Sequence, residues 1–350
     1  MRSLASFLGI LLIVLPLSAL GAAREFGIDY SRLSTKSARV QARSLAGIRA
    51  LGATWFRDVY VANTPDGLND FVNELRTAKQ LKLKLLVELL PVGDDFDGVQ
   101  PENGGDEFFK VCGWRSGSRK LSLIDLNKFS QRIRTQFAAL KAAGVTVEAF
   151  EIGNEFDLMC FNGDVPNGHE ATPAEFMTAV RAYARYLKTS AEAIHAYYPN
   201  AKILTFGLAD VLHERDGGMH HFSNPARMIA DLRNLDGYNY LDNASYHVDA
   251  YGLHVYPTRG RIAKTTQQKL ATVAILNDKP IWITEWGLKP ALYSDAEGGA
   301  RAQAAAEFYA TLDAYRGTVT FGPLFYYSYP TGLTDASGNL LPDASAILTP

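Results

Sequence analysis

The chain has 350 residues, 47% of them hydrophobic, which suffices for one large or two small globular domains with a full core. Its 35 Lys and Arg residues nearly balance 37 Asp and Glu residues, giving a formal net charge of −2 without long basic or acidic blocks. This balance argues against nucleic acid or an anionic membrane surface as the main partner.

The N-terminus has the pattern of an export signal. Arg2 is followed by an uncharged, leucine-rich run from Ser3 to Ala23 that ends in small residues. One positive charge, an apolar core and a small-residue end are typical of a secretory signal peptide. The run is also long enough for a membrane anchor, but Pro16 and the small residues favour cleavage. We predict a signal peptide over 1–23, a mature domain over 24–350, a secreted or periplasmic location and no stable membrane insertion after cleavage.

The mature chain alternates short β-branched runs with helical patterns, which indicates βα units and a parallel sheet. The predicted strands are Phe26–Asp29, Thr54–Asp58, Lys84–Leu89, Val147–Ile152, Lys202–Phe206, Ala250–His254, Ile281–Glu285 and Pro323–Ser328. Eight βα units in about 300 residues predict one α/β domain, a (β/α)8 or TIM barrel. A doubly wound open sheet is the alternative, but no Gly-x-Gly-x-x-Gly follows the first strand.

Helices are predicted between the strands from apolar periodicity and capping residues. Val40 is assigned to the apolar stripe of the first helix, Asp125 to an N-cap and Thr172-Pro173-Ala174-Glu175 to a capping box. The predicted helices are Ser37–Leu51, Leu68–Leu81, one after Asp125, one from Thr172 to about Tyr198, one from Asn224, Thr266–Asn277 and Ala300–Tyr315.

Enlarged loops are predicted after strands three, four and five, over 91–124, 156–171 and 207–223. The only two cysteines, Cys112 and Cys160, fall in the first two of these loops. In a barrel, both loops rise from neighbouring strands at the same face, so a Cys112–Cys160 disulfide is sterically natural. Two free thiols are the alternative, although an even count in an exported chain favours the bridge.

Two glutamates stand at the ends of predicted strands. Glu155 ends the fourth strand and Glu285 ends the seventh. Cleavage of a glycosidic bond needs two carboxyl groups that flank it, and a barrel builds its site at the C-terminal ends of the strands. Because strands four and seven of eight face each other across the mouth, the two carboxylates are predicted to form a facing pair.

The motifs Glu-Ile-Gly-Asn-Glu at 151–155 and Ile-Thr-Glu-Trp-Gly at 283–287 resemble those of the clan A retaining glycoside hydrolases. The closest similarity is to glycoside hydrolase families 5 and 39. The resemblance implies a (β/α)8 barrel in which Glu155 is the acid/base and Glu285 the nucleophile. It also implies that Asn154 hydrogen-bonds the sugar 2-hydroxyl.

Three further segments extend the resemblance. His254 and Tyr256 match the strand-six His-x-Tyr of the clan, whose side chains reach the neighbourhood of the nucleophile. Arg57 matches a strand-two arginine that supports the nucleophile, and a cation there favours the ionised carboxylate. The segment 332–338 resembles the last turn of many clan members.

Other positions depart from the clan pattern. Strand three carries Glu88 where several families have histidine or asparagine, and Glu88 is either a sugar-binding carboxylate or a rim charge. Tyr327 and Tyr329 could replace the tryptophan platform of strand eight. Trp114 is either a sugar platform or a cover over apolar rim surface. Trp286, next to the nucleophile, either supports the site or packs outward against helices.

The sequence therefore predicts an exported, monomeric, retaining β-glycoside hydrolase with a carbohydrate substrate and without cofactor or metal. Double displacement requires a carboxyl separation of ~5–5.5 Å, and ~9 Å would favour inversion. It also requires a raised pKa at Glu155, for which the negative charge of Glu285 is a natural cause. Strict strand alternation would point Asn154 and Glu155 to opposite faces, so the strand must break its pleat if both serve the site.

Two other functions remain open at this point. One is a catalytically silent glycan-binding barrel. The other is a metal-dependent barrel hydrolase that uses the three histidines after strand five, which are His213, His220 and His221.

Overall fold

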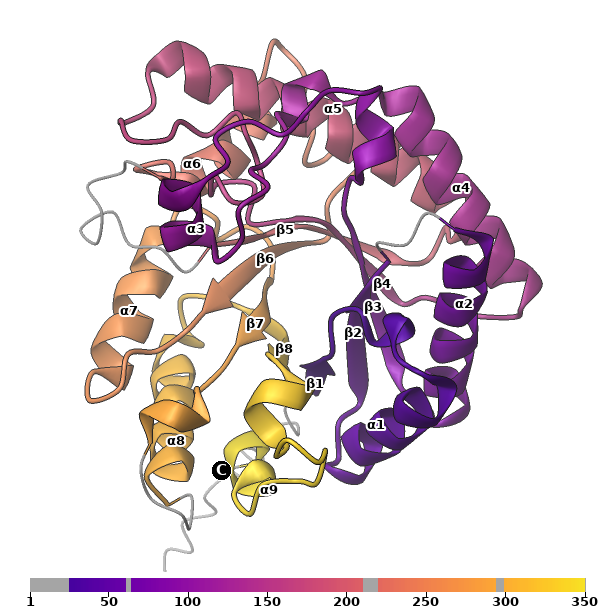
Figure 1. Cartoon of the computed structure of the whole chain (residues 1–350). Helices are drawn as coiled ribbons and strands as arrows, with labels where there is room; N and C mark the ends of the chain where they lie inside the picture. The colour runs from indigo at the N-terminus through magenta and orange to yellow at the C-terminus, as the bar shows by residue number, and fades with distance from the viewer. Residues whose placement is uncertain (1–24, 61–63, 210–219, 294–298, 350) are drawn as a thin grey trace, which may run out of the picture.

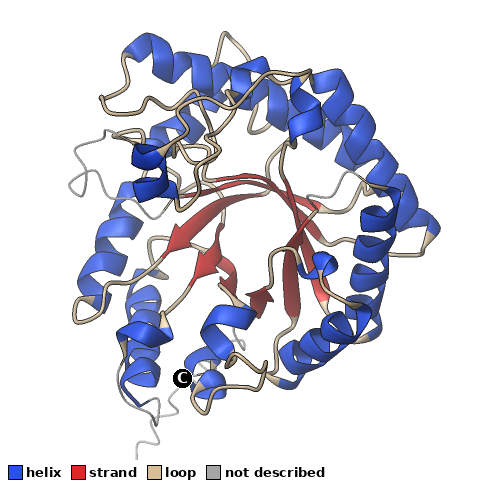
Figure 2. Cartoon of the chain, viewed as in Figure 1, coloured by secondary structure: helices blue, strands red, loops and turns tan. Residues whose placement is uncertain are grey.

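A computed structural model describes residues 25–60, 64–209, 220–293 and 299–349. Its eight strands are parallel and close into a barrel in chain order, with β1 paired to β8. Figures 1 and 2 show helices around this central barrel. The strands are β1 (Phe26–Asp29), β2 (Trp55–Val59), β3 (Lys84–Leu89), β4 (Ala149–Asn154), β5 (Lys202–Leu208), β6 (Ala250–Val255), β7 (Ile281–Trp286) and β8 (Phe321–Tyr326). The predicted (β/α)8 barrel is confirmed, whereas the predicted signal peptide over 1–23 lies outside the described residues.

The main helices follow their strands as the sequence predicts. They are α1 (Ala38–Ala50), α2 (Pro65–Gln80), α4 (Leu126–Ala142), α5 (Pro173–Tyr197), α6 (Pro225–Ala230), α7 (Ile262–Thr272) and α8 (Gly299–Tyr315). Two short helices are additional: α3 (Asp106–Cys112) in the loop after β3, and α9 (Ala344–Leu348) near the C-terminus. Within the described parts of the chain, no helix is both long and apolar enough to span a bilayer.

The predicted helix starts at Asp125 and Thr172 are confirmed by their side-chain hydrogen bonds. Asp125 accepts the amides of Asn127 and Lys128, and Thr172 exchanges a full capping box with Glu175. These bonds satisfy amides that the first helical turn leaves unpaired.

Some predicted boundaries are wrong. Helix α7 begins at Ile262, not at Thr266, because buried Ile262 already belongs to its apolar face. Strand β8 ends at Tyr326, the last residue paired with β1, so Tyr327 lies beyond the strand. Val40 is 40% exposed rather than on the inner stripe, because the buried face of α1 begins one position later, at Gln41.

The barrel interior is built in layers. Its lower layer is a buried apolar cluster of inward-facing residues: Trp55, Leu86, Ala149, Leu204, Ala250, Trp282 and Phe325. Side chains two positions apart share a strand face, so the next inward residues on β2, β3 and β4 are Arg57, Glu88 and Glu151. The apolar layer thus supports a charged layer nearer the C-terminal ends of the strands.

The predicted disulfide is present. Cys112, the last residue of α3, bonds Cys160 in the loop after β4, with the two Cα atoms 5.4 Å apart. Trp114 lies beside this bridge, and its ring meets Phe108 at 5.9 Å and Phe161 at 5.6 Å, both edge-on. This packing favours the interpretation of Trp114 as a cover over apolar rim surface.

We expect the double substitution Cys112→Ser/Cys160→Ser to lower the free energy of unfolding by about 3 kcal/mol. The bridge joins residues separated by 48 positions and so restricts the unfolded chain. Urea unfolding of the wild type and the variant measures the loss. Reduction with dithiothreitol should destabilise the wild type to the same extent and leave the variant unchanged. Equal stability of the two proteins would show that the bridge contributes nothing.

Candidate active site

The backbone breaks its strand geometry where the Asn-Glu pair leaves β4. Gly153 has φ 95° and Glu155 has φ 43°, both in the left-handed region. A Cβ at Gly153 would also lie 2.3 Å from the ring of Phe156, so glycine is required for space as well. The predicted break in the pleat is confirmed. It lets Glu155 reach His254, while Asn154 stays buried with its Oδ1 unpaired among the described residues.

Glu285 is held at the end of β7 by side chains from two other strands. Arg57 Nη1 on β2 lies 2.9 Å from Glu285 Oε1, and the hydroxyl of Tyr256, just after β6, donates to Oε2. His254 Nδ1 lies 3.5 Å from the same Oε2. A register shift between β6 and β7 after Leu253 places His254 directly opposite Glu285.

The predicted facing pair forms around His254. His254 Nδ1 lies 2.7 Å from Glu155 Oε1, so the imidazole sits between the two glutamates. One ligand atom each of Glu155, His254 and Glu285 lie within 4.8 Å of one another. The glutamates are 130 positions apart in sequence, yet the barrel brings their carboxyl groups close together.

The surroundings push the pKa values of the two glutamates in opposite directions. Burial raises the pKa of Glu155, and the charge of Glu285 adds to this effect although His254 opposes it. Burial alone would also raise the pKa of Glu285, but His254 and Arg57 outweigh it and lower that pKa below its ordinary value. Opposite shifts in a carboxyl pair are the pattern that assigns one proton donor and one carboxylate.

His254 supplies a second positive charge to the site. Burial alone would lower the pKa of His254, but Glu285 and Glu155 outweigh burial and raise it to about 9. The imidazole is therefore protonated at neutral pH, and its Nδ1–H donates to Glu155 Oε1.

Arg57 is the hub of the charged layer beneath the pair. Besides Glu285, its fully buried guanidinium bonds Asp29 at 2.6 Å, Glu151 at 2.8 Å and Glu88 at 3.0 Å. Burial raises the pKa of Asp29 to about 6 and that of Glu88 well above its ordinary value, although Arg57 opposes both shifts. Glu88 is thus not a rim charge, because it is buried and its Oε2 accepts from Arg57.

Sequence reasoning missed Asp29 and Glu151 as partners of Arg57. Both are charged residues inside otherwise apolar strands, and that pattern is a signal for an inward-facing functional layer. Asp29 also pairs in register with Arg57 across β1 and β2.

The predicted aromatic residues divide between the site and the core. Tyr327 is 39% exposed, and its ring meets that of Tyr256 edge-on at 6.2 Å, so it borders the site. Tyr329 does not: it is buried, stacks on Tyr30 and reaches Gly47 of α1. Trp286 is also absent from the site, because its buried ring packs outward against Phe308 of α8. Successive strand residues face opposite sides, so the neighbour of an inward Glu285 faces the helices.

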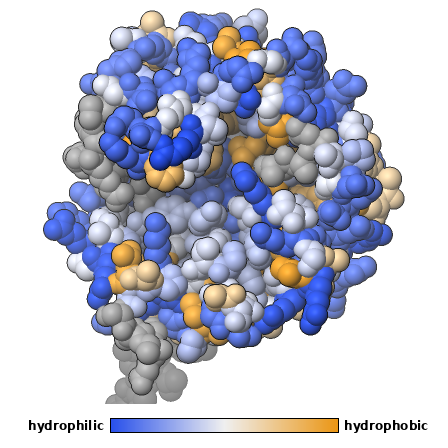
Figure 3. Space-filling view, viewed as in Figure 1, coloured by the Kyte–Doolittle hydropathy of each residue, from blue (hydrophilic) through white to orange (hydrophobic). Residues whose placement is uncertain are grey.

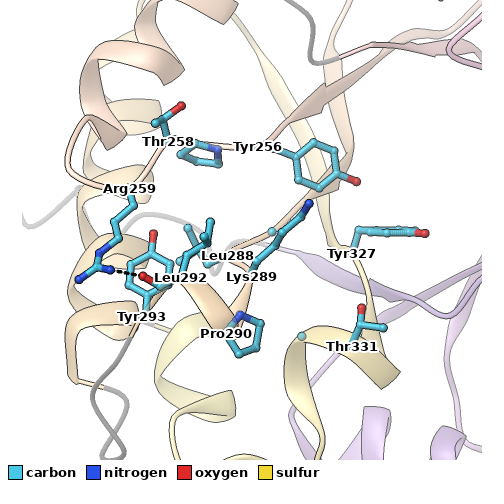
Figure 4. A pocket seen from close by; sticks show the side chains of 13 residues that line it. Tyr256, Thr258, Arg259, Leu288, Lys289, Pro290, Leu292, Tyr293, Tyr327 and Thr331 are labelled. Carbon is cyan, nitrogen blue, oxygen red and sulfur yellow. Dashed lines mark hydrogen bonds between the residues drawn. The ribbon is translucent and has the colours of Figure 1, made fainter. Parts of the chain in front are cut away.

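A cavity of about 680 Å³ opens beside the pair, between the segments that follow β6, β7 and β8. Figure 4 shows Tyr256 and Tyr327 on its inner side. Viewed from the same direction as in Figure 1, the surface of the molecule is hollowed at its centre (Figure 3).

Among the described residues, the group able to offer metal ligands is the set Glu155, His254 and Glu285. A metal bound there would have to displace a proton from His254, whose pKa Glu285 and Glu155 raise to about 9. The histidine loop gives no alternative among the described residues. His213 lies outside them, and His221 directs Nδ1 at the carbonyl of Phe222 at 2.8 Å.

The closed barrel defines the class of protein as a (β/α)8 barrel, with two glutamates paired at the C-terminal ends of its strands. In agreement, residues 158–319 match the family described as glycosyl hydrolase catalytic core. This segment contains His254, Tyr256 and Glu285 but begins just after Glu155. The resemblance to glycoside hydrolases predicted from the sequence is confirmed.

Solved structures share the fold at low sequence identity. An endo-1,4-β-D-mannanase from Thermotoga petrophila RKU-1 is 14% identical, with a TM-score of 0.55 and 90% of each chain covered. A GH5-4 broad-specificity endoglucanase from an uncultured bacterium is 12% identical, with a TM-score of 0.57 and 92% of each chain covered. A fungal β-1,4-galactanase is 15% identical, with a TM-score of 0.54, and the match covers 93% of this chain and 99% of that one. No curated protein sequence matches this chain.

Proposed function

We propose that the protein is a retaining β-glycoside hydrolase. The observation that carries this proposal is the pair Glu155 and Glu285, whose carboxyl oxygens lie within 4.8 Å and whose pKa values shift in opposite directions. A separation this short fits double displacement, because inversion needs ~6.5–9.5 Å to admit a water molecule between sugar and base.

In the proposed reaction, Glu285 attacks the anomeric carbon while Glu155 gives its proton to the leaving glycosidic oxygen. The C–O bond to the leaving group breaks as an ester bond to Glu285 forms. Glu155, now a carboxylate, then takes a proton from water, whose oxygen attacks the anomeric carbon and releases Glu285. Arg57, Tyr256 and His254 hold Glu285 ionised and oriented.

Asn154 is assigned to the sugar 2-hydroxyl. Its buried Oδ1 makes no hydrogen bond within the described structure. Because buried polar atoms in folded proteins normally have a hydrogen-bond partner, we expect the substrate to supply one. A sugar 2-hydroxyl at this position would donate to Oδ1, and this hydrogen bond would become stronger in the transition state.

The substrate is proposed to be a β-linked oligo- or polysaccharide. The solved structures with this fold include proteins named as a β-1,4-mannanase and a β-1,4-galactanase. We further propose that the protein acts as a secreted or periplasmic monomer and binds no nucleic acid. The disulfide supports the exported location, and the near-neutral charge argues against a nucleic-acid partner.

A screen of aryl β-glycosides and β-glycan polysaccharides tests the proposal, with Glu285→Gln as the inactive control. Turnover should give a product that first appears as the β-anomer, which NMR of the fresh hydrolysate detects. An α-anomer would exclude retention. Binding of β-glycans without any turnover would instead support the catalytically silent barrel, and loss of turnover on chelation would support a metal-dependent hydrolase.

The pH profile of kcat/KM should be bell-shaped, because Glu285 must be ionised and Glu155 protonated in the free enzyme. Activity falls at low pH as Glu285 takes up a proton, and at high pH as Glu155 loses one. Tyr256→Phe removes a hydrogen bond that favours the ionised Glu285, so the acidic limb should move to higher pH by about one pH unit.

Tyr327→Phe is the matched control for this prediction. Its hydroxyl also lies near the site but makes no hydrogen bond to Glu285, so the acidic limb should stay in place. Equal movement of the limb in both variants would show that Tyr256 does not control the ionisation of Glu285.

A further inference from the structure

The cavity beside the catalytic pair shares a wall with the site. Its inner side is formed by Tyr256 and Tyr327, and Tyr256 also donates to Glu285 (Figure 4). A sugar ring bound at Glu285 would therefore have the cavity as its neighbour.

Gly287 lines this cavity and packs tightly against the backbone of Tyr327. It lies two residues after Glu285, and a Cβ at this position would stand 2.4 Å from the carbonyl oxygen of Tyr327 and 3.7 Å from the ring of Tyr256. The first distance is shorter than real Cβ contacts allow, so a side chain would push these walls apart. Position 287 therefore requires glycine for the segments after β7 and β8 to lie this close together.

The charge in the cavity has one sign. Lys289 and Arg259 line it, and no Asp or Glu does so among the described residues. Arg259 is already engaged, because its guanidinium lies 5.5 Å from the ring centre of Tyr293 and donates to the carbonyl of Leu292.

Lys289 is different from Arg259. It is exposed, and it forms no ion pair with any residue that the structure describes. Figure 4 shows its ammonium group directed toward the space between Tyr256 and Tyr327. The ammonium group of Lys289 is therefore directed at the wall that the cavity shares with the catalytic site.

Most of the remaining wall is apolar, with Pro257, Leu288, Pro290 and Leu292 among its members. Apolar walls with a few directed polar groups are typical of ligand-binding cavities.

We propose that this cavity is a subsite for a sugar that carries a negative charge, either a carboxylate or a sulfate ester, with Lys289 as its ligand. The ammonium would form a charge-assisted hydrogen bond to the anion, whereas a neutral sugar leaves it hydrated. This inference rests on the proposed glycosidase function and adds the substrate class to it.

The test compares substrates that differ only in charge. The neutral β-linked oligosaccharide that the enzyme cleaves best is assayed beside two derivatives, one oxidised at its primary alcohols to carboxylates and one sulfated there. The wild type should prefer at least one charged form in kcat/KM, and Lys289→Gln should lower the charged-to-neutral ratio about five-fold. Raising the salt concentration from 0.05 to 0.5 M, roughly the range over which surface charges become screened, should lower the wild-type ratio too.

Lys264→Gln is the matched control, because Lys264 is an exposed lysine on α7 that does not line the cavity. It should leave the charged-to-neutral ratio unchanged. Preference for only one derivative identifies the anion as carboxylate or sulfate. A wild-type charged-to-neutral ratio at or below one would overturn the proposed subsite, and so would equal ratios in the wild type and Lys289→Gln. In either case, continued cleavage of the neutral substrate would still support the glycosidase function. Failure to cleave any β-linked substrate would instead contradict the function itself.

Discussion

Glu285→Ala is expected to lower kcat/KM on an aryl β-glycoside by about 10⁴-fold or more, the range seen when a catalytic nucleophile is removed. The substitution takes away the group that attacks the anomeric carbon, and no neighbouring carboxylate can replace it. Glu151 and Glu88 are buried and bonded to Arg57, which keeps them in the layer below the site. Initial rates of the wild type and the variant, both checked for folding by thermal unfolding, measure the effect.

Rescue by azide separates the two glutamate roles. In Glu285→Ala the small anion would occupy the space of the lost carboxylate and attack from that face, which gives an α-glycosyl azide. In Glu155→Ala azide would instead attack the glycosyl-enzyme from the opposite face, which gives the β-glycosyl azide. Reversed products would exchange the assignments of Glu155 and Glu285, and an unimpaired Glu285→Ala enzyme would remove the proposed mechanism.

Arg57→Met is expected to lower the free energy of unfolding by about 3–5 kcal/mol, as loss of one partner does in buried ion pairs. The side chain is fully buried, and its removal leaves the carboxyl groups of Asp29, Glu88, Glu151 and Glu285 without their shared cation. Without that cation, burial would raise the pKa values of Asp29 and Glu88 further, and Glu285 would lose one of the groups that lower its pKa. A raised pKa in the folded state destabilises once the pH exceeds the unfolded value, so the loss should be smaller at pH 5 than at pH 8.

Urea unfolding at the two pH values measures this loss. Arg181→Met is the matched control, because Arg181 pairs with a single acid, Asp236, on the exposed surface. It should change stability little at either pH. A similar small change in Arg57→Met would show that the acids of the charged layer are neutral in the folded protein.

The barrel could be predicted from the sequence because its signals are local. Each strand is a short run of mainly apolar residues, and several helices begin at capping residues such as Asp125 and Thr172 that act within one turn. The glutamate pair was also predictable, because Glu155 and Glu285 lie at the C-terminal ends of β4 and β7 and strand order in a barrel fixes spatial position.

The other residues of the site could not be predicted, because their positions depend on the strand register and on where each strand ends. Four acids converge on Arg57 only because the strands are staggered in one particular register. Tyr329 and Trp286 are plausible platform residues by position, but both face the helices once the strand ends are fixed. Lys289 lies in a segment without a motif, and its role emerges only beside Tyr256 and Tyr327.

The left-handed backbone conformation of Glu155 lowers the stability of the fold, while its side chain is needed for the proposed reaction. A φ of 43° is unfavourable for any residue with a Cβ and costs on the order of 1 kcal/mol, whereas glycine adopts it freely. Selection for thermal stability alone would therefore favour glycine at position 155 and delete the proton donor. A programme that engineers this barrel for heat resistance should hold that position fixed and seek its gains elsewhere in the chain.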